Sequence, residues 1–304
     1  MELISIVIIT YNRCTDVRDL LCDINMFSNK ELLKDIIIVN NKSTESYFVV
    51  NEFIQQHPQL PIQLIEAPEN LGVSRGRNFA TQFAKGEIML YLDDDVNLKD
   101  TETLSRIATC FNQPMYYGRP LGLVSFKVLY SYNLEIQKNA FPNKHFDKYK
   151  DKTDFPAPYY VGCAHAITRK AWDETGNYPE NFFYGMEEYD FAYRLIDKGY
   201  SIKYDSSVVI IHKESPFGRT PKNEKLRMMW VNKSKVSWRY LPKKFFYSTT
   251  FMWAGEFLVK TRFNMPNFLK GCKEIFTIPG KEKRRPINKS ALDYLRETDA
   301  RLFY

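Results

Sequence analysis

The sequence predicts an α/β fold, in which a mostly parallel β-sheet is flanked by helices on both faces. Short runs of apolar, often β-branched residues alternate with segments whose apolar residues recur at helical spacing. Four strand–helix repeats of this kind lie within the first 95 residues, which is the pattern of a parallel sheet. The 304 residues suffice for a large core, and the 44% hydrophobic and 26% charged residues exclude disorder, collagen and a disulfide-stapled miniprotein.

The predicted elements follow one another with short connections. Strands are predicted at residues 4–10, 36–40, 62–66 and 87–92, and helices at residues 16–27, 47–56 and 72–85. The strands are uninterrupted apolar runs, as expected where both faces of a parallel sheet are covered. Pro58 ends the second helix and Gly86 closes the third. Because ligands of such sheets bind beyond the carboxyl ends of the strands, the residues that follow each strand are the candidate site.

The net charge of +7 is distributed unevenly along the chain. Residues 219–285 hold 17 Lys and Arg but 4 Asp and Glu, a local charge of +13, so the rest of the chain carries −6. Pro and Gly cluster in residues 215–221, where we expect the boundary. We therefore predict a first domain of residues 1–215 and a basic, aromatic-rich, mainly helical extension of residues 216–304.

Three roles fit this extension. Basic and aromatic residues interleave at residues 238–240 and 243–247, which is typical of segments that lie on anionic membrane surfaces. A groove for an anionic polysaccharide or nucleic acid, and a lid or homodimer interface, are the alternatives. No base-reading motif accompanies the charge, so we expect no nucleic-acid partner. The apolar stretch of residues 245–259 is too short for a spanning helix.

The cysteines and the N-terminus indicate a cytoplasmic protein. The five cysteines are scattered, and no pair has the spacing of a zinc site, which favours free thiols in a reducing compartment. The apolar run at the N-terminus lacks a basic flank and a cleavage site, so we interpret it as a strand and not as a signal peptide.

Three consecutive carboxylates, Asp93, Asp94 and Asp95, follow the fourth predicted strand. Like charges this close raise one another's pKa unless a cation is present. A hard divalent cation such as Mn²⁺ or Mg²⁺ would relieve the repulsion and hold phosphate oxygens. The alternative is a solvated acidic turn or a helix N-cap.

Further residues could contribute to a site. Glu187 and Glu188 lie in a second acidic group, where a carboxylate could act as general base, or could simply occupy the first turn of a helix. His212 ends an apolar run and could join a metal site as neutral imidazole, or be structural. Arg77 could reach a phosphate or a carboxylate, or form a surface salt bridge. Tyr11 offers a flat face for a base, or packs in the core.

Five motifs in this order resemble those of family 2 glycosyltransferases. They are SIVIITYNR (5–13), IIVNNKST (37–44), NLG (70–72) with Arg77 and Asn78, YLDDD (91–95), and FFYGMEEYD (182–190) with Arg194. The resemblance covers about residues 3–212, and the remaining C-terminal residues carry no motif that we can place. It implies the GT-A type of nucleotide-diphospho-sugar transferase fold and inverting sugar transfer with Mn²⁺ or Mg²⁺.

The resemblance also implies roles for individual residues. Thr10 and Tyr11 would line the nucleobase, with Arg13 completing their donor-binding motif. Asn40 occupies the position of an Asp that accepts a hydrogen bond from uracil. Because an amide can both accept and donate, this departure leaves the preferred base open.

Arg77 would steady the nucleotide and the carboxylates of the metal site. By the same resemblance, Asp95 would contact the metal with His212, Asp93 would serve the ribose and the metal, and Asp94 would face the sugar. Glu188 would be the catalytic base and Glu187 its rival. Asp190 and Arg194 would support the helix that carries both glutamates.

The function expected from this resemblance is transfer of a hexose from a nucleoside-diphosphate sugar, such as a UDP-hexose. The acceptor would be a hydroxyl of a glycan or lipid-linked glycan in cell-surface polysaccharide synthesis, at the inner face of the cytoplasmic membrane. One alternative is an inactive homologue that serves as a carbohydrate-binding or scaffold module, which Asn40 alone favours. A sugar-1-phosphate nucleotidyltransferase is a second alternative, but residues 8–25 contain no glycine for a phosphate loop, which argues against it.

Overall fold

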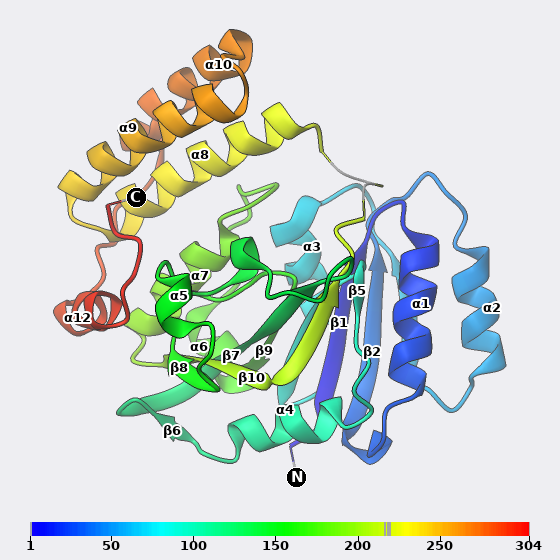
Figure 1. Cartoon of the computed structure of the whole chain (residues 1–304). Coiled ribbons are helices and arrows are strands. Elements are labelled where there is room, and N and C mark those ends of the chain that lie inside the picture. The colour runs from blue at the N-terminus through cyan, green and yellow to red at the C-terminus, as the bar shows by residue number, and fades with distance from the viewer. Residues whose placement is uncertain (1, 216, 218–219, 304) are drawn as a thin grey trace.

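A curved, mostly parallel sheet lies between two layers of helices in the computed structural model, which describes residues 2–215, 217 and 220–303 (Figure 1). The main strands are β1 (Ile4–Thr10), β2 (Leu33–Asn40), β3 (Ile62–Glu66), β4 (Ile88–Asp93), β7 (Arg119–Tyr130), β9 (Ala164–Thr168) and β10 (Ser201–His212). Three short strands complete the sheet: β5 (Val96–Asn97), β6 (Met115–Tyr116) and β8 (Asp154–Pro156). The strand order is β3-β2-β1-β4-β9-β7-β10-β5, with β6 on β7 and β8 on β10. The predicted fold class is thus confirmed.

The first four strands are parallel and end at one edge of the sheet. Thr10 pairs with Asn40 across β1 and β2, and Ile9 pairs with Asp93 across β1 and β4. This register brings the polar residues that follow β1, β2 and β4 to the same edge. The observed strands agree with the predicted ones to within a few residues, and β3 matches its prediction.

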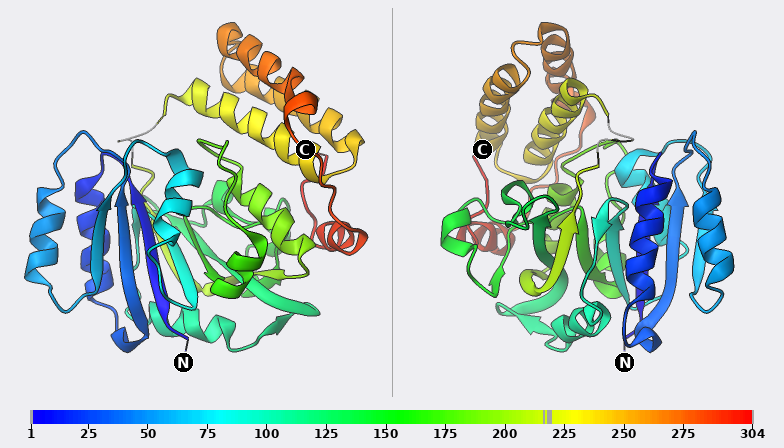
Figure 2. Two further views of the ribbon diagram at one scale, coloured as in Figure 1. Left: turned by 180° about the vertical axis from the view of Figure 1, so that it is seen from behind. Right: turned by 45° about the vertical axis from the view of Figure 1, so that its right-hand side comes forward.

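Helices cover both faces of the sheet. The helices α1 (Cys14–Asn25), α2 (Phe48–Gln56) and α4 (Thr103–Phe111) pack on one face, and α3 (Gly72–Thr81), α6 (Arg169–Thr175) and α7 (Glu187–Asp197) pack on the other (Figures 1 and 2). A short helix, α5 (Phe146–Tyr149), lies beside β8. Successive residues of β1 alternate between the faces, so Ile6 and Ile8 join one core and Val7 joins the other.

The helix α3 ends four residues earlier than predicted, at Thr81. The chain turns there because Gly86 must lie directly against β1, where its amide donates a 2.7 Å hydrogen bond to Ser5 Oγ. A Cβ atom at Gly86 would lie 2.6 Å from the backbone nitrogen of Ser5, so only glycine permits this approach.

In the second half of the sheet a strand was predicted at residues 207–211, within the observed β10, but the strand pairing was not predicted. There β9 runs antiparallel between β4 and β7, whereas β10 is parallel to β7. At its end β10 pairs with the short strand β5, and His212 lies opposite Val96. This pairing places His212 beside the acidic residues that follow β4.

The C-terminal region is helical, as predicted, and comprises α8 (Lys222–Tyr240), α9 (Lys243–Lys260), α10 (Met265–Phe276), α11 (Ile278–Lys281) and α12 (Lys289–Glu297). Trp230, Phe257 and Ile275 form a small core between α8, α9 and α10. The helix α12 returns to the sheet, where Tyr294 is buried against β10. Residues 216, 218 and 219 of the expected boundary lie outside the described residues, and the division into two domains stays a prediction.

Asp190 fastens the C-terminal helices to the rest of the molecule. Its buried carboxylate accepts hydrogen bonds from Arg194 Nε (2.9 Å), Arg239 Nη1 (2.7 Å) and the Tyr240 hydroxyl (2.9 Å). Arg194 lies on α7 with Asp190, whereas Arg239 and Tyr240 lie on α8. Asp190 was expected to support α7, and its hydrogen bonds also link α7 to α8.

Replacing Asp190 by Asn should lower the free energy of unfolding by about 3 kcal/mol, because the two guanidinium groups lose a buried counter-charge. Urea titration followed by circular dichroism measures the change. Asp173→Asn, at an exposed position of α6, is the matched control and should have little effect. Equal stability of the two variants would show that the Asp190 cluster does not hold the helices together.

Candidate active site

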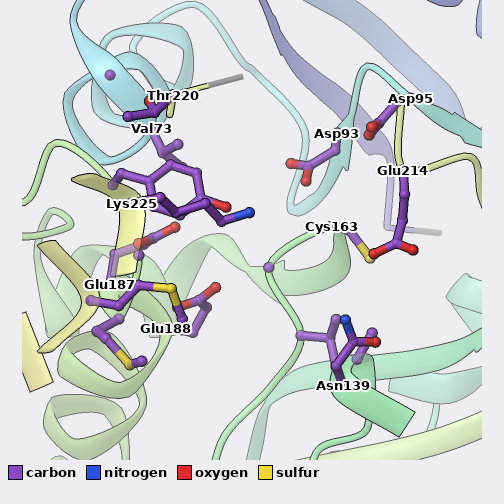
Figure 3. A pocket seen from close by; sticks show the side chains of 18 of the residues that line it. Val73, Asp93, Asp95, Asn139, Cys163, Glu187, Glu188, Glu214, Thr220 and Lys225 are labelled. Atoms are coloured by element: carbon purple, nitrogen blue, oxygen red, sulfur yellow. The ribbon is translucent and has the colours of Figure 1, made fainter. Parts of the chain in front are cut away.

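A cavity of about 1220 Å³ opens at the carboxyl ends of β1, β2 and β4. One wall is formed by residues 10–13 and 93–95, and the opposite wall by residues 183–189 at the start of α7. Figure 3 shows Asp93 and Asp95 on one side of this space and Glu187 and Glu188 on the other. The cavity therefore brings together both acidic groups that the sequence analysis singled out.

Asp93, Asp95 and His212 form a group of metal-ligating type. One oxygen of each carboxylate and one imidazole nitrogen all lie within 4.8 Å of one another. His212 Nδ1 lies 2.9 Å from Gln137 Oε1, and its Nε2 lies 3.4 Å from Asp95 Oδ1. Gln137 thus orients the imidazole toward the carboxylates, a contact between distant segments that the sequence analysis missed.

Arg13 compensates the charge of the buried carboxylates. Its Nη1 lies 2.6 Å from Asp94 Oδ1 and 3.1 Å from Asp95 Oδ2. Burial raises the pKa of Asp94 to about 7, although the attraction of Arg13 opposes the shift. Arg13 also donates to the carbonyl oxygens of Ser215 and Phe217, and the Ser215 amide donates to Asp95. The segment after β10 is thereby tied to the acidic group.

Arg77 connects the two acidic groups. This buried residue of α3 places Nη2 3.0 Å from Asp93 Oδ1 and Nη1 3.1 Å from Glu187 Oε1. Nη2 also donates to the carbonyl oxygen of Gly162. The two carboxylates raise the pKa of Arg77 although burial opposes the shift, so its positive charge is permanent. The predicted contact between Arg77 and the carboxylates is present.

The two glutamates at the start of α7 differ in their surroundings. Glu187 is buried and bound to Arg77, and its Oε2 has no hydrogen-bond partner among the described residues. Glu188 lines the cavity and is only partly buried. Burial, followed by repulsion from Glu187, raises the pKa of Glu188. A Cβ atom at Gly162 would lie 2.5 Å from Glu188 Oε1, so a larger residue there would have to displace this carboxyl group.

The residues after β1 and β2 occupy different places. Thr10 and Tyr11 line the cavity, and Thr10 Oγ1 lies 2.6 Å from the Tyr47 hydroxyl. Asn40 does not line the cavity. Its side chain accepts from the Ser43 amide (3.0 Å) and donates to Glu66 (2.8 Å).

The neighbouring Asn41 does line the cavity, and it was missed by the sequence analysis. Its Oδ1 accepts a 2.8 Å hydrogen bond from the Leu71 amide, and its Nδ2 donates to the Gly72 carbonyl. Asn41 therefore joins the end of β2 to the start of α3, the helix that carries Arg77. Two adjacent asparagines at a strand end gave no signal as to which one faces the site.

The C-terminal helices contribute a third wall of the cavity. The uneven net charge, which set residues 216–304 apart from residues 1–215, did not predict this contribution. Lys233 of α8 and Trp253 of α9 line the cavity on the side of Glu188. Lys233 is only 3% exposed, and its Nζ lies 3.3 Å from the centre of the Tyr189 ring. Burial lowers the pKa of Lys233 to about 7. Residues of the extension therefore line the same cavity as Glu188.

Known proteins share the sequence pattern of this chain. The family model described as "Glycosyl transferase family 2" matches residues 5–176. A protein named "Uncharacterized glycosyltransferase YwdF" from Bacillus subtilis is 26% identical over 215 residues, which cover 71% of this chain and 75% of that protein. An "Uncharacterized protein" from Haemophilus influenzae is 25% identical over 180 residues, covering 59% of this chain and 94% of its own length.

Solved structures share the fold at low sequence identity. The mannosyltransferase PcManGT from Pyrobaculum calidifontis, solved with GDP-Man and Mn²⁺, has a TM-score of 0.61 at 16% identity, covering 97% of this chain and 79% of that one. S. aureus TarS 1-349 in complex with UDP-GlcNAc has a TM-score of 0.64 at 14% identity, covering 98% and 88%. These structures confirm the GT-A architecture. Since the family model spans more than half of the sequence, the chain belongs to glycosyl transferase family 2 and is an enzyme of that family.

Proposed function

We propose that this enzyme is an inverting, metal-dependent glycosyltransferase that moves a hexose from a nucleoside-diphosphate sugar, such as a UDP-hexose, to a hydroxyl group. The observation that carries the proposal is that one cavity holds a metal-ligating group, Asp93, Asp95 and His212, and a separate carboxyl group, Glu188. The related folds that were solved with GDP-Man and Mn²⁺ or with UDP-GlcNAc support a donor of this class.

The residues at the sheet edge fit a divalent cation. Two carboxylates and one imidazole are ligands that Mn²⁺ accepts, and the carboxylates also suit Mg²⁺. The side chain of Asp93 is 40% exposed, so it can turn an oxygen toward the cavity. When bound, such an ion supplies positive charge that neutralises a diphosphate leaving group.

The residues at the end of β1 would hold the nucleotide. Tyr11 offers its ring to the base, and Thr10 and Arg13 line the same side of the cavity. The amide of Asn40 already bonds Ser43 and Glu66, so we propose that it shapes the loop after β2 and leaves base contact to neighbouring groups. Arg77 keeps the carboxylate of Asp93 in place between the nucleotide and the sugar.

Glu188 would act as the general base. It faces the cavity, whereas the rival Glu187 is engaged by Arg77. Glu188 would accept the proton of the acceptor hydroxyl while the hydroxyl oxygen forms a bond to the anomeric carbon and the bond to the diphosphate breaks. Attack from the face opposite the diphosphate would convert an α-linked donor into a β-linked product.

The rate of transfer should depend on pH through Glu188. A base must be deprotonated, and burial raises the pKa of Glu188 above the ordinary value of about 4.3. We therefore expect kcat/KM to rise with pH through the neutral range. This rise should not be complete near pH 5. A pH profile at fixed donor and metal concentrations measures this. A profile that is flat from about pH 5.5 to 8.5 would contradict the assignment.

The acceptor is proposed to be a glycan or a lipid-linked glycan of a cell-surface polysaccharide. The cavity of about 1220 Å³, which residues of the C-terminal helices help to line, leaves room beside Glu188 for part of such a chain. A lipid-linked acceptor would require the enzyme to work at the inner face of the cytoplasmic membrane.

A thermal-shift screen of nucleotides and nucleotide sugars tests the proposed donor class. At about a hundred times the dissociation constant, the correct donor with Mn²⁺ should raise the melting temperature by about 5 °C. Asp93→Asn should lose most of the shift, whereas the exposed Asp173→Asn should keep it. No stabilisation by any nucleoside-diphosphate sugar with Mn²⁺ or Mg²⁺ would contradict the proposal.

A further inference from the structure

The outer surface of α9 and α10 is unusually apolar. Both helices lie beyond α8 as seen from the sheet, at the far end of the molecule (Figures 1 and 2). In the part of the chain that the structure describes, 17 large apolar side chains are exposed, and eight of them lie between residues 247 and 276. These eight are Tyr247, Phe251, Met252, Val259, Phe263, Met265, Leu269 and Phe276, and together they define the apolar patch.

The helix α9 is apolar on two faces. Its inner face buries Phe246 and Phe257 against the core around Trp230. Its outer face carries Tyr247, Phe251, Gly255 and Val259 at intervals of four residues, with Phe251 77% and Val259 72% exposed. A helix that faces water has a polar outer face, whereas a helix that is apolar all round is normally covered.

The helix α10 continues the apolar patch. Met265, Leu269 and Phe276 share one side of this helix, because intervals of four and seven residues return to the same face. Phe276 is 88% exposed. Phe263 lies in the turn between the two helices and is also exposed. The patch therefore spans both helices and their connection.

The exposed charged residues of α9, α10 and their connection are all cations in the described part of the chain. Six exposed basic residues lie on or between the two helices: Lys243, Lys244, Lys260, Arg262, Lys270 and Lys273. The two acidic residues of this segment are both paired, Glu256 with Lys260 and Glu274 with Arg227 of α8. The surface thus combines large apolar side chains with an excess of positive charge.

The apolar side chains and the surrounding positive charge together indicate what binds this surface. A symmetric dimer through this face would set the same basic rim on both partners, and like charges would oppose it. No helix among the described residues is long and apolar enough to cross a membrane. An anionic bilayer surface satisfies both features, because apolar side chains enter the acyl boundary while lysines meet lipid phosphates. We propose that the apolar patch of α9 and α10 docks the enzyme on anionic membranes.

Docking in this way would bring the cavity to the membrane. Trp253, Glu256 and Lys260 of α9 line the cavity, while Phe251 and Val259 of the same helix face outward. One helix therefore separates the bilayer surface from the site. If the proposed transfer to a lipid-linked glycan holds, the acceptor would reach Glu188 without leaving the membrane. The docking itself depends on the outer surface alone and not on the proposed chemistry.

Flotation of the full chain with lipid vesicles tests the docking. The probe is a vesicle of phosphatidylcholine with about one third phosphatidylglycerol, compared with phosphatidylcholine alone. We expect binding to the anionic vesicles and a reduction of at least about fivefold in the double variant F251S/F276S. The matched control is M26S/F48S, which removes two other exposed apolar side chains, at the end of α1 and the start of α2, and should bind like the original chain.

Each other outcome would overturn the proposal. Failure of the original chain to float with anionic vesicles would do so, and so would equal binding of F251S/F276S. Sedimentation velocity of the same proteins detects the alternative occupant. A dimer that F251S/F276S dissociates, without vesicle binding, would show that the patch is an interface between two copies. None of these measurements uses a sugar donor, so failure of the docking is distinguishable from failure of the proposed transfer.

Discussion

Glu188→Gln should lower the rate of sugar transfer by about a thousandfold while leaving the donor affinity within about twofold. Glutamine has nearly the same size but cannot accept the proton of an attacking hydroxyl. Because Glu188 lines the cavity without holding the proposed nucleotide or metal residues, the substitution should leave binding intact. Single-turnover transfer, together with donor binding by calorimetry, measures the two effects separately.

The neighbouring glutamate provides the control for this substitution. Glu187→Gln weakens the ion pair with the buried Arg77 and should therefore reduce stability as well as activity. Glu188→Gln should reduce activity without reducing stability, which thermal unfolding can check. Full activity of Glu188→Gln, or loss of activity in Glu187→Gln alone without loss of stability, would transfer the role of base to Glu187.

Asp95→Ala should weaken Mn²⁺ binding by at least about a hundredfold and abolish transfer. Asp95 is buried beside His212 and contributes to the group of ligand atoms that lie within 4.8 Å of one another. Arg13 contacts both Asp94 and Asp95, so removal of Asp95 leaves one carboxylate fewer to offset its positive charge. That charge would then repel an incoming cation more strongly. Electron paramagnetic resonance of free Mn²⁺ measures the affinity directly.

The exposed Asp173→Asn again serves as control and should bind Mn²⁺ like the original chain. A matched test of the imidazole is His212→Gln, which should weaken binding less than Asp95→Ala because it leaves both carboxylates. If Asp95→Ala retained the original Mn²⁺ affinity and activity, the ion would have to be held elsewhere, and the assignment of the residues after β4 would be wrong.

The fold was predictable where a single strand or helix carries its own signal. The apolar run of β1 and the polar residues that follow it were both readable, because a strand buried on both faces is apolar along its length. The antiparallel insertion of β9 between β4 and β7 was not. Strand pairing between segments more than 70 residues apart depends on the packing of the whole sheet, and the sequence of β9 alone does not encode it.

Residues of the site were predictable where they lie in a motif, and were missed where they do not. Asp93, Asp95 and His212 come together as the resemblance implied, because β10 ends beside the turn after β4. Gln137 and Lys233 could not be found, since each reaches the cavity from a segment without a motif. Asn40, which the resemblance places at the nucleobase, bonds Ser43 and Glu66, and the adjacent Asn41 lines the cavity.

Charge was a guide to part of the molecule only. The excess of Lys and Arg in residues 219–285 marks the C-terminal helices, but Lys233 of that segment lies in the cavity wall. A net charge counts residues without distinguishing buried from exposed ones. The exposed cations on α9 and α10 support the proposed membrane surface, whereas the buried Lys233 is a part of the site.

The most direct test of the central proposal is the anomeric configuration of the sugar released from an α-linked donor. Proton NMR can follow slow hydrolysis of the donor that the thermal-shift screen identifies, with Mn²⁺ present and water in place of the acceptor. We predict that the β-anomer appears first, that chelation of the metal stops the reaction, and that Glu188→Gln slows it. Initial release of the α-anomer, or hydrolysis that continues unchanged without a divalent cation, would contradict an inverting, metal-dependent enzyme.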